Sequence, residues 1–253
     1  DSEQDIFSGR YVRFVQNTIT LATLAAIVTV AAAVFISTFT RFASSRLSLV
    51  AMFVGRLGYA VPGGVIAVGL LVPFANFDNW LDAQMIKLFG ISTGLLLTGS
   101  VTLLVIAYMI RFLAVAIGSY DSGLAAISIN VDRASQMMGG TTGRTIWKIH
   151  LPILKINVFT AALIVFVDTI KELPATLILR PFNYDTLAVH AFRLASDERL
   201  DAAAIPILMI ALVGLVPVVL ICMKISEPQK RRAPENAPSV DRVDKLITSN
   251  QTH

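Results

Sequence analysis

Few ionisable residues in this sequence lie where they could do chemistry inside an apolar segment. Asp168, Lys171 and Glu172 are spaced at i, i+3 and i+4, which puts the three side chains along one face of a helix. Two carboxylates on such a face could line a path for a cation. Alternatively, Lys171 could neutralise a neighbouring carboxylate at the helix end, and the sequence leaves both interpretations open.

Other chemistry-bearing patterns are missing from the sequence. The histidines, His150, His190 and His253, are far apart, and the single cysteine, Cys222, lies in an apolar block. No set of residues has the spacing of a metal site or of a catalytic triad. The sequence also has no G-x-x-x-x-G-K-[ST] motif, so it is not expected to hydrolyse ATP itself. We therefore expect no catalytic residue, no metal site and no cofactor.

The composition is that of a membrane protein. Of 253 residues, 55% are hydrophobic and 15% are charged, and the mean hydropathy is +0.70. A soluble domain has about 25% charged residues, so that class is excluded. The net charge of +4 could suggest nucleic acid, but the basic residues fall between apolar blocks and form no basic domain. We expect no nucleic-acid partner.

Five apolar blocks are long enough to cross a bilayer of about 30 Å as helices. They cover about 14–39, 57–74, 91–110, 153–169 and 202–223. Pro62-Gly63-Gly64 and Pro73 predict a kinked or broken helix in the second block. The predicted fold class is all-α, a polytopic membrane protein whose two ends lie on opposite sides of the membrane.

The distribution of basic residues predicts the orientation. If the connection 111–155 is cytoplasmic, 14 of the 21 Lys and Arg residues lie inside, including those near 41–56 and those after 223. Three regions follow: an external segment 1–13, a transmembrane domain 14–225 and a flexible cytoplasmic tail 226–253. An external N-terminus without a targeting segment suggests a piece of a longer protein that lacks at least one upstream span.

The connection between the third and fourth spans is long and patterned, and its ordered part covers about 119–152. At helical spacing, Ala134, Met137 and Met138 share one side of a short helix that ends at Gly139-Gly140. A second helix over 145–149 is broken at Pro152. We expect two short helices at a right-angle bend, facing the cytoplasm. An amphipathic loop at the membrane surface is the alternative.

This connection resembles the cytoplasmic signature of bacterial ABC importer permeases: Glu-Ala-Ala, three residues, Gly, nine residues, Ile, one residue, Leu-Pro. The resemblance implies a coupling helix that docks on a separate ATP-binding subunit, a homodimer, and His150 is expected on that docking surface. Arg133 and Ser135 stand where the family has Glu and the second Ala, and Asp132 keeps an acid nearby. The residues of the ATPase-docking loop are then Asp132, Arg133, Ala134, Ser135, Gly139, Ile149, Leu151 and Pro152.

Residues 171–206, KELPATLILRPFNYDTLAVHAFRLASDERLDAAAIP, resemble the corresponding stretch of ferric iron importer permeases. The resemblance extends over about 14–225 and corresponds to the second half of a permease with two fused halves. It implies an ABC importer permease fold in the bacterial inner membrane, with Asp168, Lys171 and Glu172 as a possible translocation path or outer gate. The implied partners are the ATP-binding subunit, a periplasmic iron-binding protein, the other permease half and membrane lipid.

The outer segment carries charges suited to a docking protein. Acidic residues there could meet a cation, and Arg180, Arg193 and Arg199 could pair with acids on a binding protein. Tyr184 is either an iron ligand or, more commonly for such a position, a residue of the membrane interface. Thiamine, polyamine or phosphonate is an alternative cargo. A passive channel or a membrane-embedded enzyme is an alternative class.

Overall fold

The computed structural model describes residues 9–43 and 45–226. The chain divides into two units, residues 1–214 and 215–253, and each is described by itself. The predicted tail lies almost wholly outside the described residues, and the second unit contributes only the last part of one helix.

All regular elements of the described residues are helical, as predicted. They are α1 (Gly9–Phe42), α2 (Arg46–Leu57), η1 (Gly58–Ala60), α3 (Gly63–Phe89), α4 (Val101–Leu124), α5 (Ile129–Met137), α6 (Thr142–Thr145), η2 (Ile146–His150), α7 (Leu151–Ile170), α8 (Pro174–Leu179), α9 (Leu187–Ser196) and α10 (Leu200–Ser226). Five helical segments are long and apolar enough to cross a membrane, which agrees with the predicted number: Gly9–Phe42, Gly63–Phe89, Val101–Leu124, Thr142–Ile170 and Leu200–Val219.

Helix α1 is the longest element of the first unit. It has 34 residues, so at about 1.5 Å per residue it is about 51 Å long and its ends reach beyond the hydrocarbon core of a bilayer. It begins at Gly9, five residues before the predicted first span. Its buried positions include Ala22, Ala25, Ala26 and Ala33. These small side chains let neighbouring helices approach closely, which is how helices associate where no water drives them together.

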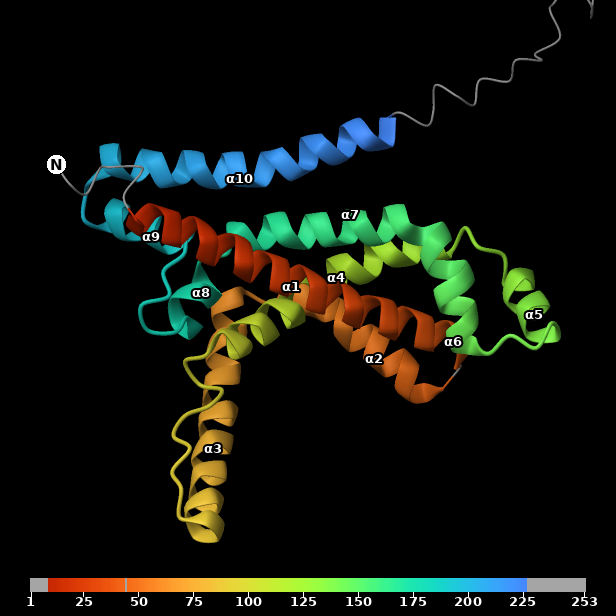
Figure 1. Cartoon of the computed structure of the whole chain (residues 1–253), viewed down its shortest axis with the longest axis horizontal. Helices are drawn as coiled ribbons and strands as arrows, with labels where there is room; N and C mark the ends of the chain where they lie inside the picture. Colours follow the sequence, from red (N-terminus) through yellow and green to blue (C-terminus); the bar gives the residue numbers. More distant parts are fainter. Residues whose placement is uncertain (1–8, 44, 227–253) are drawn as a thin grey trace, which may run out of the picture. The chain divides into compact units, whose positions relative to one another are not determined.

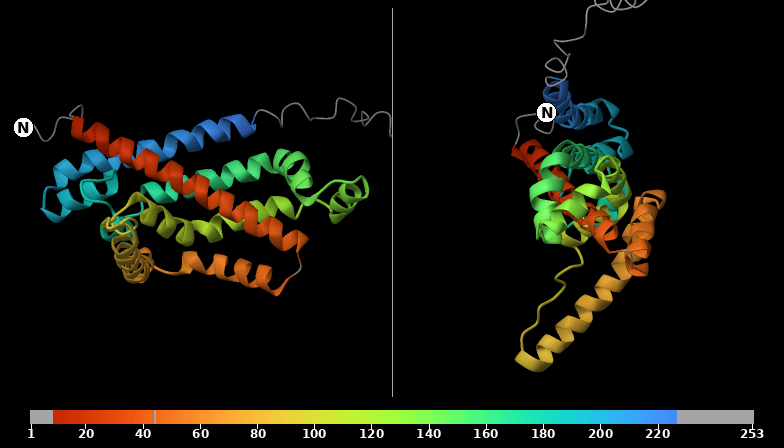
Figure 2. Two further views of the ribbon diagram at one scale, coloured as in Figure 1. Left: turned by 60° about the horizontal axis from the view of Figure 1, so that its bottom comes forward. Right: turned by 90° about the vertical axis from the view of Figure 1, so that its right-hand side faces the viewer.

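Helices α1, α4 and α7 form the core of the first unit. Figures 1 and 2 show the three helices side by side along much of their length. Leu103, Leu104 and Tyr108 of α4 are fully buried, as is Val165 of α7. Short helices α8 and α9 lie near the N-terminal end of α1, and α5 and α6 lie near the opposite end (Figure 1). The core therefore connects two separate groups of short helices.

The boundaries of the predicted second span were wrong. Residues 46–57 form the separate helix α2, and the membrane-length helix begins only at Gly63. Pro62 stands at the N-cap of α3, where its missing N–H costs nothing because the first turn of a helix has no partner for that group. Pro62 and the glycines at 63–64 therefore begin a helix, and Pro73 lies inside α3 without ending it.

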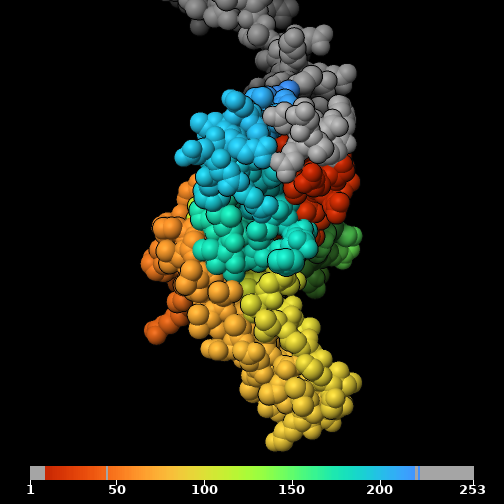
Figure 3. Space-filling model, turned by 90° about the vertical axis from the view of Figure 1, so that its left-hand side faces the viewer, coloured from red at the N-terminus to blue at the C-terminus, as the bar shows by residue number. Residues whose placement is uncertain are grey.

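The predicted start of the third span, at residue 91, was also wrong. Residues 91–100 form an irregular strap beside α3, and α4 begins at Val101 (Figures 1 and 3). Gly90 ends α3 with φ at +68°. Asp78 then accepts backbone N–H groups from Leu97 and Thr98, and Asp82 accepts that of Gly94 at 2.9 Å. The two carboxylates satisfy backbone groups that a helix would have paired internally.

The close approach of η1 to α4 generates a prediction about Gly58. A Cβ atom at this position would lie 1.9 Å from the backbone oxygen of Ile110, an overlap that no side-chain rotation relieves. Gly58→Ala should therefore lower the free energy of unfolding by about 1–3 kcal/mol or more. Thermal unfolding of the full-length protein in detergent measures this. The control is Gly118→Ala, where a Cβ meets nothing within 4 Å, and equal melting of both variants would contradict the packing.

Candidate functional site

The predicted docking segment folds as two short helices and a bend. Ser128 caps α5, and the helix ends where Gly139 takes a φ of +77°. Thr141 caps α6, and the chain continues through η2, a π-helical turn, into α7. Figure 1 shows the sharp change of direction between α6 and α7. The predicted second short helix is present before α7, but it begins at Thr142 and not at Thr145.

Pro152 does not break this second helix, contrary to the prediction. It lies in the first turn of α7, directly after η2. The N–H of Leu151 donates to the oxygen of Ile146, five residues back, as in a π-helix. The wider turn accommodates a proline that an uninterrupted α-helix would not tolerate. The π-helical turn and the proline together make the bend that leads from the docking segment into the core.

A buried charged joint holds α5 to the core. Arg41, near the end of α1, donates from Nε to Asp132 Oδ2 at 2.7 Å, and its other two nitrogens donate to the backbone oxygens of Leu124 and Ile127 at 2.7 Å. The second oxygen of Asp132 lies 2.6 Å from Nε2 of His150. These contacts join α1, the C-terminal end of α4, α5 and η2. We call Arg41, Asp132 and His150 the docking joint.

The predicted docking residues divide into two groups. Asp132 and Ser135 face inward: Asp132 belongs to the docking joint, and the Ser135 hydroxyl lies 2.7 Å from that of Thr145 on α6. Exposed residues of the predicted set are Arg133, Ala134, Gly139 and Pro152, while Ile149 and Leu151 are half-buried. His150 is fully buried, so its predicted place on the docking surface was wrong. Its imidazole fixes α5 from inside.

The outward side of this segment combines large apolar residues with the polar residues Arg133, Gln136, Arg144 and Lys148. Met137 is 89% exposed, Met138 is 80% exposed and Trp147 is 74% exposed. Met137 lies on α5, Met138 directly follows that helix, and Trp147 lies on η2. Apolar side chains with this much exposure on one segment are typical of a surface that another protein covers. Methionine and tryptophan are well suited to fill a cleft, because one is flexible and the other is large and rigid.

A second cluster of charges lies at the other end of α7. Lys171 Nζ is 2.8 Å from Asp168 Oδ1, so these two residues form the local ion pair that was one of the two predicted alternatives. The hydrogen bond to Asp168 raises the pKa of Lys171 above its ordinary value. Lys171 therefore stays charged throughout the physiological range. Asp168 is neutralised and is not an open carboxylate.

Glu172 does not share that pair. It follows the end of α7 and is buried, with Oε2 3.1 Å from Nε of Arg111 on α4. Arg111 also donates to the backbone oxygen of Val61 at 3.0 Å. Arg111 lies 13 residues before the end of α4, about 20 Å along the helix. It was predicted to begin the cytoplasmic connection and instead lies within α4 beside Glu172, because that helix continues to Leu124.

The Arg111–Glu172 pair is enclosed but not saturated. Its second oxygen, Glu172 Oε1, is buried and accepts no hydrogen bond among the described residues. A Cβ at Gly63 would lie 2.2 Å from that oxygen, so a larger residue where α3 begins would have to displace the Glu172 side chain. A buried carboxylate oxygen without a partner is costly in a purely structural ion pair. Such an atom is a candidate for a functional contact.

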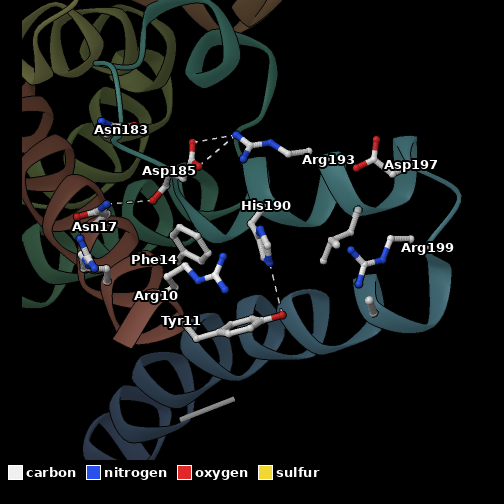
Figure 4. A pocket seen from close by; sticks show the side chains of 13 residues that line it. Arg10, Tyr11, Phe14, Asn17, Asn183, Asp185, His190, Arg193, Asp197 and Arg199 are labelled. Carbon is white, nitrogen blue, oxygen red and sulfur yellow. Dashed lines mark hydrogen bonds and ion pairs between the residues drawn. The ribbon is translucent and has the colours of Figure 1, made fainter. Parts of the chain in front are cut away.

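Two arginines, one directly after α8 and one on α9, form ion pairs within the chain. Asp185 pairs with Arg180. It also pairs with Arg193 at 3.1 Å, as Figure 4 shows. Tyr184 donates its hydroxyl to the backbone oxygen of Asn17 at 3.2 Å, and burial raises the pKa of this phenol. A protonated, hydrogen-bonded Tyr184 has the character of an interface residue. Among the described residues, no group of three or more His, Cys, Asp or Glu side chains could hold a metal ion.

Sequence reasoning missed Arg41, Arg111 and His150 as parts of these clusters. Arg41 is 91 residues from Asp132, and Arg111 is 61 residues from Glu172. Motif spacing carries no information about such distant pairs. The one available signal was the position of each arginine inside or at the end of a long apolar helix, where a charge needs a partner.

The fold is that of the permeases of ABC transporters. A solved bacterial alginate ABC transporter, in complex with a periplasmic protein carrying an alginate pentasaccharide, matches with a TM-score of 0.69 at 18% identity, over 85% of this chain and 78% of that chain. A second structure, of an ABC transporter involved in alginate import, has a TM-score of 0.67 at 18% identity, over 91% and 82%. No model of a known protein family matches the chain.

Sequence relatives confirm the predicted resemblance to ferric iron permeases. The chain is 27% identical over 177 residues to the Fe(3+)-transport system permease protein FbpB 2 of Haemophilus influenzae, covering 69% of this chain and 32% of that protein. It is 23% identical to a putative 2-aminoethylphosphonate transport system permease protein, PhnV, of Salmonella typhimurium, covering 68% and 57%. The chain thus spans about a third to just over half of the length of these relatives.

The docking joint generates a prediction about Asp132. Asp132→Asn keeps the size of the side chain but leaves the Arg41 charge without its carboxylate, and breaking a buried ion pair costs about 3–5 kcal/mol. We expect faster hydrogen exchange of the α5 amides and a lower melting temperature in the full-length protein.

The control for this variant is Arg56→Gln. Arg56 pairs with Asp121 at 2.8 Å, but its side chain is 57% exposed, and exposed pairs contribute about 0–1 kcal/mol. Equal hydrogen exchange of α5 in both variants would show that the joint does not hold the docking segment.

Proposed function

We propose that this chain is the transmembrane permease part of a binding-protein-dependent ABC importer that moves ferric iron across the bacterial inner membrane. ATP is hydrolysed by a separate pair of ATP-binding subunits. A periplasmic iron-binding protein delivers the cargo, and the other permease half and membrane lipid surround the described helices. The C-terminus lies in the cytoplasm, on the side where the ATP-binding subunits dock.

The docking segment carries this proposal. Its exposed face offers Met137, Met138 and Trp147 to a partner, while Asp132 ties the same segment to α1 through Arg41 and to η2 through His150. A push on α5 therefore reaches α1 through Arg41 and reaches α7 through His150 and η2. Rigid transmission of this kind is what a permease needs to turn closure of an ATPase pair into a change between outward-open and inward-open arrangements.

Relatives named for ferric iron transport support the cargo. The relatives named for 2-aminoethylphosphonate transport favour a second candidate, a phosphonate, within the same class of importer. Thiamine and polyamine remain alternatives on the sequence pattern alone. A passive channel has no use for a rigid, partner-facing docking segment, and energy dependence separates it from an importer.

Uptake of labelled ferric iron tests the proposal. Bacterial cells lacking the full-length permease receive the wild-type gene or the Gly139→Trp version, and uptake is measured with and without depletion of ATP. Gly139 has a φ of +77°, a conformation that costs other residues about 1–2 kcal/mol. Gly139→Trp should keep ATPase activity and lose uptake. Gly139→Asn is the control, because asparagine tolerates this conformation.

Three outcomes decide between the candidates. Uptake restored only by the wild-type gene and the Gly139→Asn gene, and abolished without ATP, supports the importer. ATP-dependent uptake of labelled phosphonate but not of iron replaces the cargo. Uptake that persists without ATP contradicts the importer class.

The Arg111–Glu172 pair is the proposed outer gate, and a double variant separates this role from a structural one. Arg111→Met with Glu172→Met removes both charges and replaces them with apolar side chains, a change that often leaves stability unchanged or raises it. We expect a folded protein with a melting temperature near that of the wild type and strongly reduced uptake. Lys171→Gln, at a side chain 65% exposed, should leave uptake near normal. Normal uptake by the double variant would make the pair structural.

A further inference from the structure

A cavity of about 450 Å³ lies near the N-terminal end of α1, away from both charge clusters described above. Its walls come from the first two turns of α1, residues 183–185, helix α9 and the turn that leads into α10 (Figure 4). Cavities of about 300–1,000 Å³ are the usual size for small ligands. Segments more than 160 residues apart in the sequence therefore enclose a space of ligand size.

The charge of this cavity is positive. Arg10 and Arg13 of α1, Arg193 of α9 and Arg199 contribute four guanidinium groups to the lining, while Asp185 and Asp197 contribute two carboxylates. Arg180, which is not part of the lining, also forms an ion pair with Asp185 and balances its charge. Within the described part of the chain, Asp185 forms ion pairs with Arg180 and Arg193, and neither Arg10 nor Arg13 takes part in one.

The walls are held in place by contacts between α1 and α9. Tyr11 is buried, and its ring meets His190 edge to face at a centroid distance of 5.3 Å. Phe14 also packs on His190, with a ring centroid distance of 4.6 Å. The side-chain amide of Asn17 donates to the backbone oxygen of Asp185 at 3.0 Å. The elements that carry the arginines are therefore held together by these contacts, while the four arginine side chains themselves are exposed.

Guanidinium groups determine the chemistry of the ligand. Their planar, forked donors match the oxygens of phosphate and carboxylate groups and repel a bare metal cation. We infer that this cavity binds a small phosphate or phosphonate oxyanion, with Arg10 and Arg13 as its main ligands. The same chemistry could come from a free ion or from the headgroup of an anionic lipid.

The side of the membrane on which the ligand arrives rests on the proposed function. Arg13 and Arg41 of the docking joint are 28 residues apart on one continuous helix, about 42 Å along its axis, which exceeds the hydrocarbon thickness of about 30 Å. If the docking segment faces the cytoplasm, the cavity faces the outside. The charge and size of the cavity do not depend on that orientation.

Binding to the purified full-length permease complex in nanodiscs tests the inference. Inorganic phosphate and methylphosphonate are titrated calorimetrically, with sodium chloride at matched ionic strength as the control titration. Arg13→Gln should weaken binding about ten-fold or more, because a charge-assisted hydrogen bond is lost. Arg46→Gln removes an exposed arginine at the other end of the first unit and should leave binding unchanged.

Nanodisc composition distinguishes the two sources of the oxyanion. In phosphatidylcholine nanodiscs, binding of free phosphate or methylphosphonate that depends on Arg13 supports a site for a free ion. If phosphatidylglycerol prevents that binding, and Arg13→Gln reduces the amount of phosphatidylglycerol that copurifies with the protein, the lipid headgroup is the ligand. Either result supports the oxyanion site.

Two results would overturn the site. One is the absence of any Arg13-dependent binding of phosphate, methylphosphonate or phosphatidylglycerol. The other is an Arg13→Gln variant that loses only capture of the periplasmic binding protein, which would make the cavity a protein-docking surface. Uptake of iron by the wild-type protein is measured alongside. It stays ATP-driven under either result, whereas a failure of the proposed function abolishes it in the wild type as well.

Discussion

Arg41 satisfies three acceptors at the point where α1, α4 and α5 meet, and the arrangement of the docking segment depends on it. A guanidinium taken out of water is expensive unless each donor has a partner. The backbone oxygens of Leu124 and Ile127 and the carboxylate of Asp132 provide those partners at 2.7 Å. The requirement to pair one charge fixes the end of α4, the start of the docking segment and the position of α5 relative to α1.

The same constraint operates at the other charged positions of the core. Arg111 within α4 meets Glu172 after α7, and it also reaches the backbone of Val61 before α3. Helices α1 and α4 therefore each carry an arginine, Arg41 and Arg111, at a place where two or more chain segments converge. Neither cluster is saturated: among the described residues, His150 Nδ1 of the docking joint and Glu172 Oε1 both lack a hydrogen bond. Every Arg41 nitrogen, by contrast, donates to an acceptor.

Polar groups also decide where helices stop. Asp78 and Asp82 lie on an apolar helix, yet their carboxylates hold the strap 91–100 by its backbone N–H groups. That strap had the hydropathy of a span, which is why the third helix was predicted ten residues too early. Similarly, Pro152 has the sequence character of a helix breaker, but the π-helical turn before it removes the conflict. In both cases the local preference of the sequence was overridden by a hydrogen-bonding arrangement that only the folded chain provides.

The sequence by itself determined the number of membrane-length helices, the presence of two short docking helices, the end of the first of them at Gly139, and the resemblance to ferric iron permeases. These features depend on hydropathy over about 20 residues, on glycine geometry and on motif spacing, all of which are local. Only the tertiary structure decided that Asp132 and His150 face inward, that Arg111 pairs with Glu172 and that four arginines surround one cavity. The physical reason is that a buried charge takes its partner from whichever helices pack beside it, and the packing of α1 against α4 and α7 brings together residues that are far apart in the chain.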